Sequence, residues 1–548
     1  MAEGSEGVSL ASVTFSKKEL EALVGRKLGS GCIETALPSL GMPIENVEEE
    51  EICVDITPNR PDLLSVEGIA RALAAFIGGK AKEYDAEESD VKLRIDSSVL
   101  SMRPFIVGAV VKDVKINDEV VESLMQLQEK LHETYGRKRR KVSIGVHNFD
   151  AVQPPFLYKA VKPRSYSFVP LGMEEKLNLS QILEKHPKGR EYGSIISHFS
   201  GYPLLVDSKE QVLSFPPVIN GELTRVNRNT KNLFIDVTGT DENAVMDALK
   251  IVALSLVDRG GKLHTVEVAG KRKFKTPDLR ERVVELPAEK INNMLGTNFT
   301  QAQLFKLLER MGYARTGGRL KVPCYRVDIM DWVDLAEDVA IAYGYNSLTP
   351  SLPNFFSIGK EKRSEIVEGR LKELLVGLGF NQAVCQNLIS ERECFEKALL
   401  PEKPHVKIKN PKVEEYTMMR CWLLPSLLSV LFQSRQAELP IKLFEIGDVL
   451  SLDGSHVTES RSLACALYDS KATFNEIKSM AEAVAREMGW KVGMRVAEHP
   501  SFIKGRAAEL FCGKKKVGVL GEIHPQVINN FGLEQPVALL EMDITSFF

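Results

Sequence analysis

Apolar side chains recur along the chain with two different periods, which indicates a mixture of strands and helices. In the segment EEICVDIT (50–57), every second residue is apolar, a pattern typical of a half-buried strand. Leu124, Leu127 and Leu131 recur instead every three or four residues, which places them on one face of a helix. Because both patterns occur along much of the chain, the sequence predicts an α+β protein.

The same periods, together with the glycines and prolines that interrupt them, predict individual elements. The predicted helices cover 17–28, 119–135, 241–257, 287–295, 300–311, 332–343 and 364–378. The predicted strands cover 103–111, 142–147, 203–206, 211–214, 233–238, 319–323, 382–388, 404–408, 441–446, 507–511 and 516–520.

Changes in composition along the chain predict four domains. The acidic stretch 86–90 lacks large apolar residues and is predicted as a linker, and the basic run Lys271–Lys275 is predicted as a further boundary. The predicted domains are an N-terminal module over 1–85, an α+β domain over 91–270, a small helix-rich domain with an acidic cluster over 276–350, and a C-terminal domain over 355–548.

The bulk composition narrows the class of protein. The 548 residues exceed one hydrophobic core, since domains typically have ~100–200 residues. The formal net charge of -3 provides no overall basic field, so any contact with nucleic acid must be local or supplied by a partner. None of the eight cysteines forms a C-x-x-C pair, and scattered cysteines fit a reducing cytosol. The first residues do not resemble a signal peptide, and no apolar stretch approaches the ~20 residues of a membrane span. We therefore expect a cytoplasmic protein with no membrane partner.

General catalytic motifs are absent from the sequence. There is no phosphate-binding G-x-x-x-x-G-K-[ST] loop, and the glycines Gly29 and Gly31 lack the third glycine of a dinucleotide-binding loop, so we predict a turn there.

The run VDIMDWVDLAEDVAIAYGYN contains the densest group of acidic residues. Asp334, Glu337 and Asp338 share one face of a predicted helix, and Asp328 precedes that helix. Carboxylate oxygens suit Mg²⁺, which takes one or two carboxylates and keeps several waters. The helix dipole stabilises acidic residues near a helix N-terminus without any metal. The sequence alone leaves both interpretations open.

The basic run Arg137–Lys141 follows a predicted helix directly and has two interpretations. It suits the phosphates of an RNA strand, or it is a solvated charged turn.

The segment from Pro203 to Asp241 combines predicted paired strands with many small polar residues. Several of these polar residues could converge on a pocket floored by Leu204 and Leu205, although a scaffold of paired strands has a similar composition without any site. The candidates are Ser214, Asn220, Glu222, Thr224, Asp236 and Thr238.

Five blocks, in order along nearly the whole chain, resemble the phenylalanyl-tRNA synthetase beta subunits of the archaeal/eukaryotic type. They are DITPNRPDLLSVEGIARAL, RPFIVGAVVKDV with LQEKLHETYGRKRRKVSIGVHNFD, SFPPVINGELTRVNRNTKNLFIDVTGTD, the acidic run from Asp328 to Asn346, and NPKVEEYTMMRCWLLPSLL with LFEIGDV and GVLGEIHP. The resemblance implies an editing domain in the second predicted domain and a class II synthetase-like antiparallel sheet domain at the C-terminus.

The resemblance also implies functional residues, cofactors and partners. Asp328, Asp334, Glu337 and Asp338 fall on positions that the family assigns to magnesium, and the helix after Ser364 resembles an element that packs against an alpha subunit in an (αβ)₂ heterotetramer acting on tRNA(Phe). The implied editing-pocket residues are Leu204, Ser214, Asn220, Glu222, Asp236 and Thr238.

The C-terminal part departs from a working class II active site. Such a site needs an arginine on the ATP α-phosphate and a glycine-rich run that ends in arginine. Arg420 is isolated, and the final segment PVALLEMDITSFF contains neither residue. We therefore expect ATP to bind to the alpha subunit and this domain to be catalytically inactive.

A separate editing site has a physical rationale. When an analogue differs only by an added hydroxyl, an apolar pocket rejects it by just ~10²-fold. A synthetase for phenylalanine therefore benefits from hydrolysing Tyr-tRNA(Phe). Glu222 or Asp236 would recognise the tyrosine hydroxyl, with Ser214, Asn220 and Thr238 placing the ester and a water. With no Ser-His-Asp set visible in the sequence, we expect direct attack by water. A non-catalytic tRNA-binding scaffold and a free-standing tRNA editing hydrolase are the alternatives.

Overall fold

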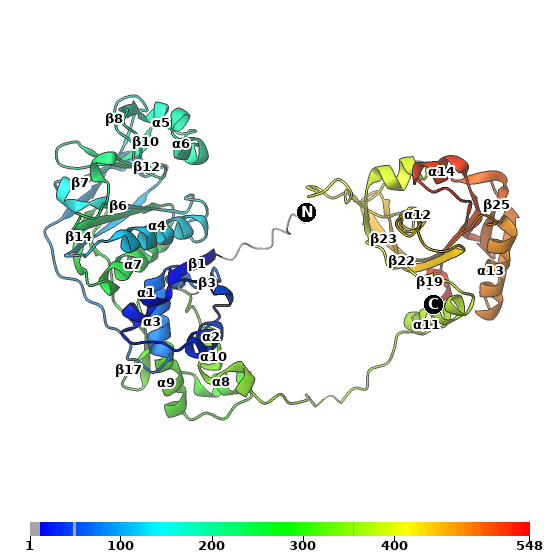
Figure 1. The fold of residues 1–548 in the computed structure, drawn as a ribbon, viewed down its shortest axis with the longest axis horizontal. Helices are drawn as coiled ribbons and strands as arrows, with labels where there is room; N and C mark the ends of the chain where they lie inside the picture. The colour runs from blue at the N-terminus through cyan, green and yellow to red at the C-terminus, as the bar shows by residue number, and fades with distance from the viewer. Residues whose placement is uncertain (1–10, 48–50, 355) are drawn as a thin grey trace. The chain divides into compact units, whose positions relative to one another are not determined.

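The chain divides into two compact units, Met1–Leu352 and Pro353–Phe548 (Figure 1). The computed structural model describes residues 11–47, 51–354 and 356–548. The predicted absence of a signal peptide rests on the first residues, and 1–10 lie outside this description. Among the described residues, no helix has both the length and the apolar character that crossing a membrane requires.

The first unit begins with a small sheet and three helices. The sheet has the order β1-β3-β2, and the alternation in β3 (Glu51–Ile56) buries Ile52, Val54 and Ile56 as its period predicts. The other elements are β1 (Ala11–Ser16), β2 (Ile44–Val47), α1 (Lys17–Val24), α2 (Ser30–Ser39) and α3 (Val66–Phe76).

Two predictions for this module were wrong. Helix α1 ends at Val24 because Gly25 takes a left-handed conformation with φ of 79°, so the predicted helix over 17–28 is too long. The predicted turn at Gly29 and Gly31 is the start of α2, with Gly29 as its N-cap.

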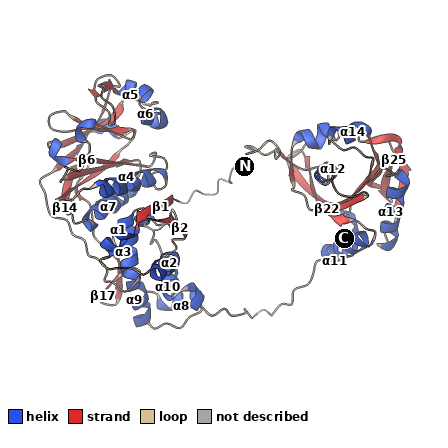
Figure 2. Ribbon diagram, viewed as in Figure 1, coloured by secondary structure: helices blue, strands red, loops and turns tan. Residues whose placement is uncertain are grey.

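A ten-stranded sheet forms the centre of the first unit. Its main path runs β12-β11-β10-β7-β4-β14-β5-β13-β6, and β15 pairs with β14. Helices α4 and α7 lie on one face, where Ile235 and Val237 of β13 point, and Phe234 packs into a second core on the other face (Figure 2). The bounds are β4 (Lys92–Ile95), β5 (Phe105–Lys112), α4 (Asp118–Glu133), β6 (Val142–Asn148), β7 (Phe156–Val161), β10 (Tyr202–Val206), β11 (Val212–Phe215), β12 (Ile219–Asn220), β13 (Leu233–Gly239), α7 (Glu242–Asp258), β14 (Lys262–Ala269) and β15 (Lys273–Thr276).

A small cap covers the β10–β12 end of this sheet. It consists of β8 (Ser167–Phe168), β9 (Leu177–Asn178), α5 (Leu179–Lys185) and α6 (Pro187–Tyr192). Leu177, Leu179 and Ile182 pack there against Leu204 and Phe215 of the sheet.

Both predicted boundaries of the sheet domain were wrong. Glu87 forms a parallel bridge with His264 of β14, so the stretch 86–90 belongs to the sheet rather than to a linker. The basic run Lys271–Lys275 contributes to β15, which pairs with β14 through Lys273, Phe274 and Lys275. Backbone pairing holds both segments despite their polar composition.

A helix-rich module completes the first unit. Its three-stranded sheet has the order β16-β18-β17, and the predicted helices are found close to their predicted positions. The elements are β16 (Arg282–Val284), α8 (Ala288–Leu295), α9 (Gln301–Arg310), β17 (Ala314–Thr316), β18 (Arg319–Val322) and α10 (Trp332–Tyr343).

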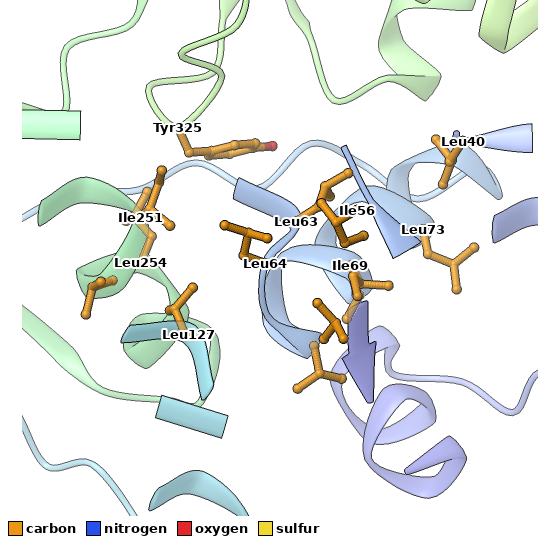
Figure 3. Close-up of a cluster of buried hydrophobic side chains, with 14 of the residues drawn as sticks. Leu40, Ile56, Leu63, Leu64, Ile69, Leu73, Leu127, Ile251, Leu254 and Tyr325 are labelled. Carbon is orange, nitrogen blue, oxygen red and sulfur yellow. The ribbon is translucent and has the colours of Figure 1, made fainter. Parts of the chain in front are cut away.

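One hydrophobic core joins the three parts of the first unit, so they pack together as one compact unit. Leu64 of the first module, Ile251 of α7 and Tyr325 of the helix-rich module belong to this core (Figure 3). Arg71 adds a polar connection, because it forms an ion pair with Asp258 at 2.6 Å and stacks over the ring of Tyr325.

The second unit is a seven-stranded sheet with the order β19-β22-β23-β27-β26-β25-β24, antiparallel except for the β19–β22 pair. Helices α12 and α14 pack into one core and α11 and α13 into another, with alternate residues of the strands in each. The bounds are α11 (Arg363–Gly377), β19 (Asn381–Gln382), β20 (Leu388–Ile389), β21 (Met418–Met419), α12 (Leu424–Gln433), β22 (Ile441–Asp453), β23 (His456–Tyr468), α13 (Phe474–Glu487), β24 (Val492–Val496), β25 (Phe502–Cys512), β26 (Lys515–Ile523), α14 (Pro525–Asn530) and β27 (Val537–Asp543).

Two strands predicted for the second unit were wrong. The predicted strand over 382–388 is reduced to the ends of two short strands, because Val384 in its middle is 87% exposed and no strand pairs with it. The segment 404–408 contributes only an isolated bridge between Lys407 and Met418.

Candidate functional site

A cavity of about 420 Å³ lies where the two ends of the main strand path, β12 and β6, meet. Asn220 of β12 donates to the Val146 carbonyl of β6 at 3.5 Å, so the first and last strands of that path approach each other. Residues of α4, β6 and the β11–β12 region line the cavity. The volume is in the range of small-molecule sites, which are typically ~300–1,000 Å³.

A buried histidine and aspartate lie together at this cavity. Asp236 of β13 lines it and binds His147 of β6, with 2.7 Å between Oδ2 and Nε2. The other ring nitrogen, Nδ1, lies 2.8 Å from the Thr224 hydroxyl. Asp236 and Thr224 thus hold the His147 ring at both of its nitrogens.

Gly145 makes room for this pair. It stands opposite Asp236 in the β13–β6 register, and a Cβ there would lie 2.2 Å from Asp236 Oδ2 and 2.7 Å from His147 Nε2. Asp236 Oδ1 forms no hydrogen bond with the described residues. One carboxylate oxygen is therefore fixed by His147, and the other is left for a ligand.

Three further side chains of the cavity wall carry buried polar atoms without a partner. These atoms are Ser214 Oγ, His132 Nδ1 and Arg139 Nε. Burial, with the nearby charges of Arg139 and Arg103, lowers the pKa of His132 well below its ordinary value, so its ring is neutral. Its Nε2 accepts from the Ile144 amide at 2.9 Å, which leaves the proton on the unpartnered Nδ1. Unsatisfied buried polar atoms are uncommon in native proteins, and three of them occur together around this one cavity.

The structure brings together three of the six editing residues that the resemblance implies, and Thr224, the further pocket candidate, lines the same cavity. Ser214, Asn220 and Asp236 all line this one cavity. Ser214 and Asn220 are direct partners in the β11–β12 register, so the hairpin itself sets their spacing.

The other three predicted residues do not line it. Leu204 is fully buried in the core beneath the cap. Glu222 accepts from the Gly172 amide at 2.8 Å and pairs with Arg225 at 2.8 Å. Thr238 accepts from Arg103 Nε at 2.9 Å, away from the cavity. Glu222 and Thr238 are therefore engaged by neighbouring residues, and Leu204 belongs to the hydrophobic core.

Comparisons with known proteins bear on the whole chain. Residues 348–544 match the family described as the phenylalanyl tRNA synthetase beta chain CLM domain, and residues 284–345 match the tRNA synthetase B5 domain. The chain is 42% identical to the phenylalanine–tRNA ligase beta subunit of Archaeoglobus fulgidus and 41% identical to that of Methanocaldococcus jannaschii. The alignments cover 98% of this chain in both cases, with 98% and 100% of the relatives.

This chain is also similar to a solved structure of a beta-subunit fragment. A crystallised N-terminal fragment of the phenylalanyl-tRNA synthetase beta subunit from Pyrococcus horikoshii has 40% sequence identity and a TM-score of 0.59, over 61% of this chain and 100% of the fragment. The chain belongs to the phenylalanine–tRNA ligase beta subunits. It is thus a component of an aminoacyl-tRNA synthetase, and the multidomain α+β fold is that of the family.

The acidic residues of this beta subunit do not form a shared metal site. Asp328 and Asp338 both bind the buried Arg326, at 2.7 and 2.8 Å, while Asp334 accepts from the amides of Met330 and Asp331. Burial raises the pKa of Asp328, but the hydrogen bond and charge of Arg326 outweigh it and hold that pKa below its ordinary value. Among the described residues, no three His, Cys, Asp or Glu side chains are grouped to hold a metal.

The one arginine considered for an ATP site in the beta subunit is already engaged. Arg420 is 1% exposed, pairs with Glu445 at 2.7 Å and donates to the Asp448 carbonyl at 2.9 Å. Gly447 lies so close that an added Cβ would be 2.2 Å from an Arg420 nitrogen. The guanidinium is therefore packed inside the protein and does not face an open phosphate site.

Sequence reasoning missed two histidines, His132 in the cavity wall and His147, which binds Asp236. His147 lies in GVHNFD, two residues after Gly145, so the two residues share one face of a strand. This spacing could have marked His147 as a candidate site residue. His132 lies on the predicted helical stripe beside Leu131 and looks like an ordinary core histidine. Only the pairing of β6 with β13 reveals that His147 meets Asp236.

Proposed function

We propose that this chain hydrolyses Tyr-tRNA(Phe) in the cavity between β6 and the β11–β12 hairpin. The observation that carries the proposal is the buried Asp236, fixed by His147 on one oxygen and free on the other. A carboxylate accepts a strong hydrogen bond from the tyrosine hydroxyl. Phenylalanine would leave the same buried group unpaired, at a cost of ~1–3 kcal/mol or more for a charged group.

The remaining polar atoms suit the ester and the attacking water. Ser214 and Asn220 line the same cavity as Asp236, and Ser214 Oγ has no hydrogen-bond partner among the described residues. Both nitrogens of His147 are engaged, by Asp236 and Thr224, so no base lies on the Ser214 hydroxyl. This arrangement favours direct attack by a positioned water over an acyl-enzyme.

The experiment uses the holoenzyme, meaning this chain with its proposed alpha subunit. Given ATP, tyrosine and tRNA(Phe), the wild-type holoenzyme is expected to form AMP continuously without accumulating Tyr-tRNA(Phe). Gly145→Ala should accumulate it, because the added Cβ would lie 2.2 Å from Asp236 Oδ2 and would displace the carboxylate.

The matched control is Gly201→Ala, where the added Cβ has no neighbour nearer than 3.5 Å. This variant should behave as the wild type. Accumulation of Tyr-tRNA(Phe) by the unmodified holoenzyme would refute the proposal.

We further propose that aminoacylation belongs to the alpha subunit, which would bind ATP and assemble with this chain as (αβ)₂ on tRNA(Phe). The packing of Arg420 against Glu445 supports an inactive class II-like domain in the second unit. The isolated chain should give no phenylalanine-dependent ATP–pyrophosphate exchange, and exchange should appear when the alpha subunit is added. Exchange by the chain alone would contradict this division.

Magnesium and a cytoplasmic location are also proposed for the holoenzyme. Within this chain, Glu337 is the predicted ligand whose carboxylate makes no hydrogen bond or ion pair with the described residues. Asp328, Asp334 and Asp338 are engaged as described above. No step of the proposed hydrolysis depends on the metal.

A further inference from the structure

The turn between α4 and β6 has an unusual backbone. Arg137, Lys138 and Arg139 have φ of 50°, 54° and 62°, a left-handed conformation that non-glycine residues rarely take even singly. Backbone hydrogen bonds maintain it, from the Arg139 amide to the His132 carbonyl and from the Lys141 amide to the Gly136 carbonyl. We call residues 137–141 the basic turn. An outlier of this kind persists only where the surroundings fix it, and such outliers cluster at functional sites.

The side chains of the basic turn lie partly in the cavity wall and partly outside it. Arg139 is 7% exposed and enters the wall of the cavity, where it donates to the carbonyls of Pro217 and Val218 at 3.3 and 3.0 Å. It also stacks on the ring of Tyr192, with 4.4 Å to the ring centre. Arg137, Lys138 and Arg140 are exposed and line an adjoining hollow of about 710 Å³.

The hollow has little compensating negative charge. Lys141 pairs with Asp241 at 3.4 Å, and these two residues line it together with Thr240 and the three exposed cations. None of the side chains of Arg137, Lys138 and Arg140 has an ion-pair partner among the described residues. The chain as a whole carries a formal net charge of -3, so this is a local concentration of positive charge.

The buried Arg103 holds the backbone of the basic turn in place. Arg103 donates to the Thr238 hydroxyl and carbonyl and, at 3.3 Å, to the carbonyl of Arg140. Burial lowers the pKa of Arg103 to about 10, which still leaves it charged at neutral pH. The same residues therefore hold the basic turn and the strand that carries Asp236.

We propose that the basic turn binds the phosphates of the single-stranded 3′ end of an RNA and thereby leads its last nucleotide into the cavity. Three cations without partners match the negative charge of successive phosphates. Arg139 links them to the cavity, since it lies in the wall while its neighbours lie outside. The inference rests on the proposed function, because it takes the cavity to receive the aminoacyl end of tRNA.

The test removes the three exposed cations and leaves Arg139 in place. In the holoenzyme, R137Q/K138Q/R140Q should lower kcat/KM for deacylation of Tyr-tRNA(Phe) about tenfold or more. The slope of log K for tRNA binding against log salt should fall by about 2, given ~0.7 for each phosphate contact to a single strand. Hydrolysis of the 3′-tyrosyl ester of adenosine should be unchanged, because that substrate has no phosphates to reach the turn.

The control K92Q/K115Q/K209Q removes the same charge from exposed lysines of the same unit and should change neither measurement. An unchanged salt slope in the triple variant, or an equal loss on the adenosine ester, would overturn the inference. Weakened assembly with the alpha subunit and unchanged tRNA binding would assign the turn to a protein partner and overturn it equally. If the wild type hydrolyses neither substrate, the proposed function fails, while the salt slope still tests the basic turn.

Discussion

Asp236→Asn is expected to lower the deacylation of Tyr-tRNA(Phe) by roughly 10–10²-fold, which corresponds to the ~1.5–3 kcal/mol of a hydrogen bond to a charged group. The substitution keeps the size of the side chain but removes the charge that faces His147 at 2.7 Å and accepts the tyrosine hydroxyl. The measurement is single-turnover deacylation of preformed Tyr-tRNA(Phe) by the holoenzyme. Synthesis of Phe-tRNA(Phe) should continue at the wild-type rate.

Glu222→Gln provides the matched control, because it makes the same chemical change in the same segment. Glu222 binds the Gly172 amide and Arg225 and does not line the cavity. Its deacylation rate should stay within about twofold of the wild type. Equal rates for Asp236→Asn and the wild type would remove Asp236 from the site.

Arg326→Ala should destabilise the first unit by ~3–5 kcal/mol, the range for removing one partner of a buried ion pair. Arg326 is 3% exposed and binds Asp328 and Asp338, so its loss removes the ion-pair partner of both carboxylates and leaves Asp328 with the more distant charge of Arg60. Asp338 keeps only the hydroxyl of Tyr313, at 2.6 Å. Urea denaturation of the full chain, followed by a probe in the first unit, measures the change.

A charge-neutral variant separates this explanation from simple loss of packing. R326A/D328N/D338N removes the unpaired carboxylates together with the arginine, and it should recover at least half of the lost stability. A loss below about 1 kcal/mol in Arg326→Ala, or no recovery in the triple variant, would show that the ion-pair network does not hold this module together.

The periodic segments were predictable because their pattern reflects the core that they face. Helix α10 begins and ends at the predicted residues, and β13 is predicted to within one residue. The boundary predicted between 350 and 355 coincides with the division between the two units. The two boundaries of the sheet domain were not predictable from composition, because the stretch 86–90 and the run Lys271–Lys275 are held by backbone pairing, which needs no apolar side chains. The core shared by the three parts of the first unit depends likewise on contacts between distant segments.

The candidate site was predictable only in part, because the sequence reveals polar residues that lie close together along the chain but not contacts between distant segments. Ser214 and Asn220 lie close in sequence on one hairpin, and Asp236 follows on a nearby strand, so a cluster of polar residues pointed to all three. His147 is 89 residues from Asp236, and only the register of β6 against β13 brings them together. For the acidic run, helical spacing placed Asp334, Glu337 and Asp338 on one face but could not reveal that Arg326 binds Asp338.

The most direct measurement compares two substrates that differ by a single hydroxyl. Tyr-tRNA(Phe) and Phe-tRNA(Phe), mixed separately with excess wild-type holoenzyme, are deacylated in a single turnover. If Asp236 binds the hydroxyl in this cavity, the tyrosyl ester should be cleaved at least about 100-fold faster, since a site built to hydrogen-bond a hydroxyl can reject the analogue that lacks it by up to ~10⁴–10⁵-fold. Equal rates for the two esters, or no cleavage of the tyrosyl ester, would contradict the account.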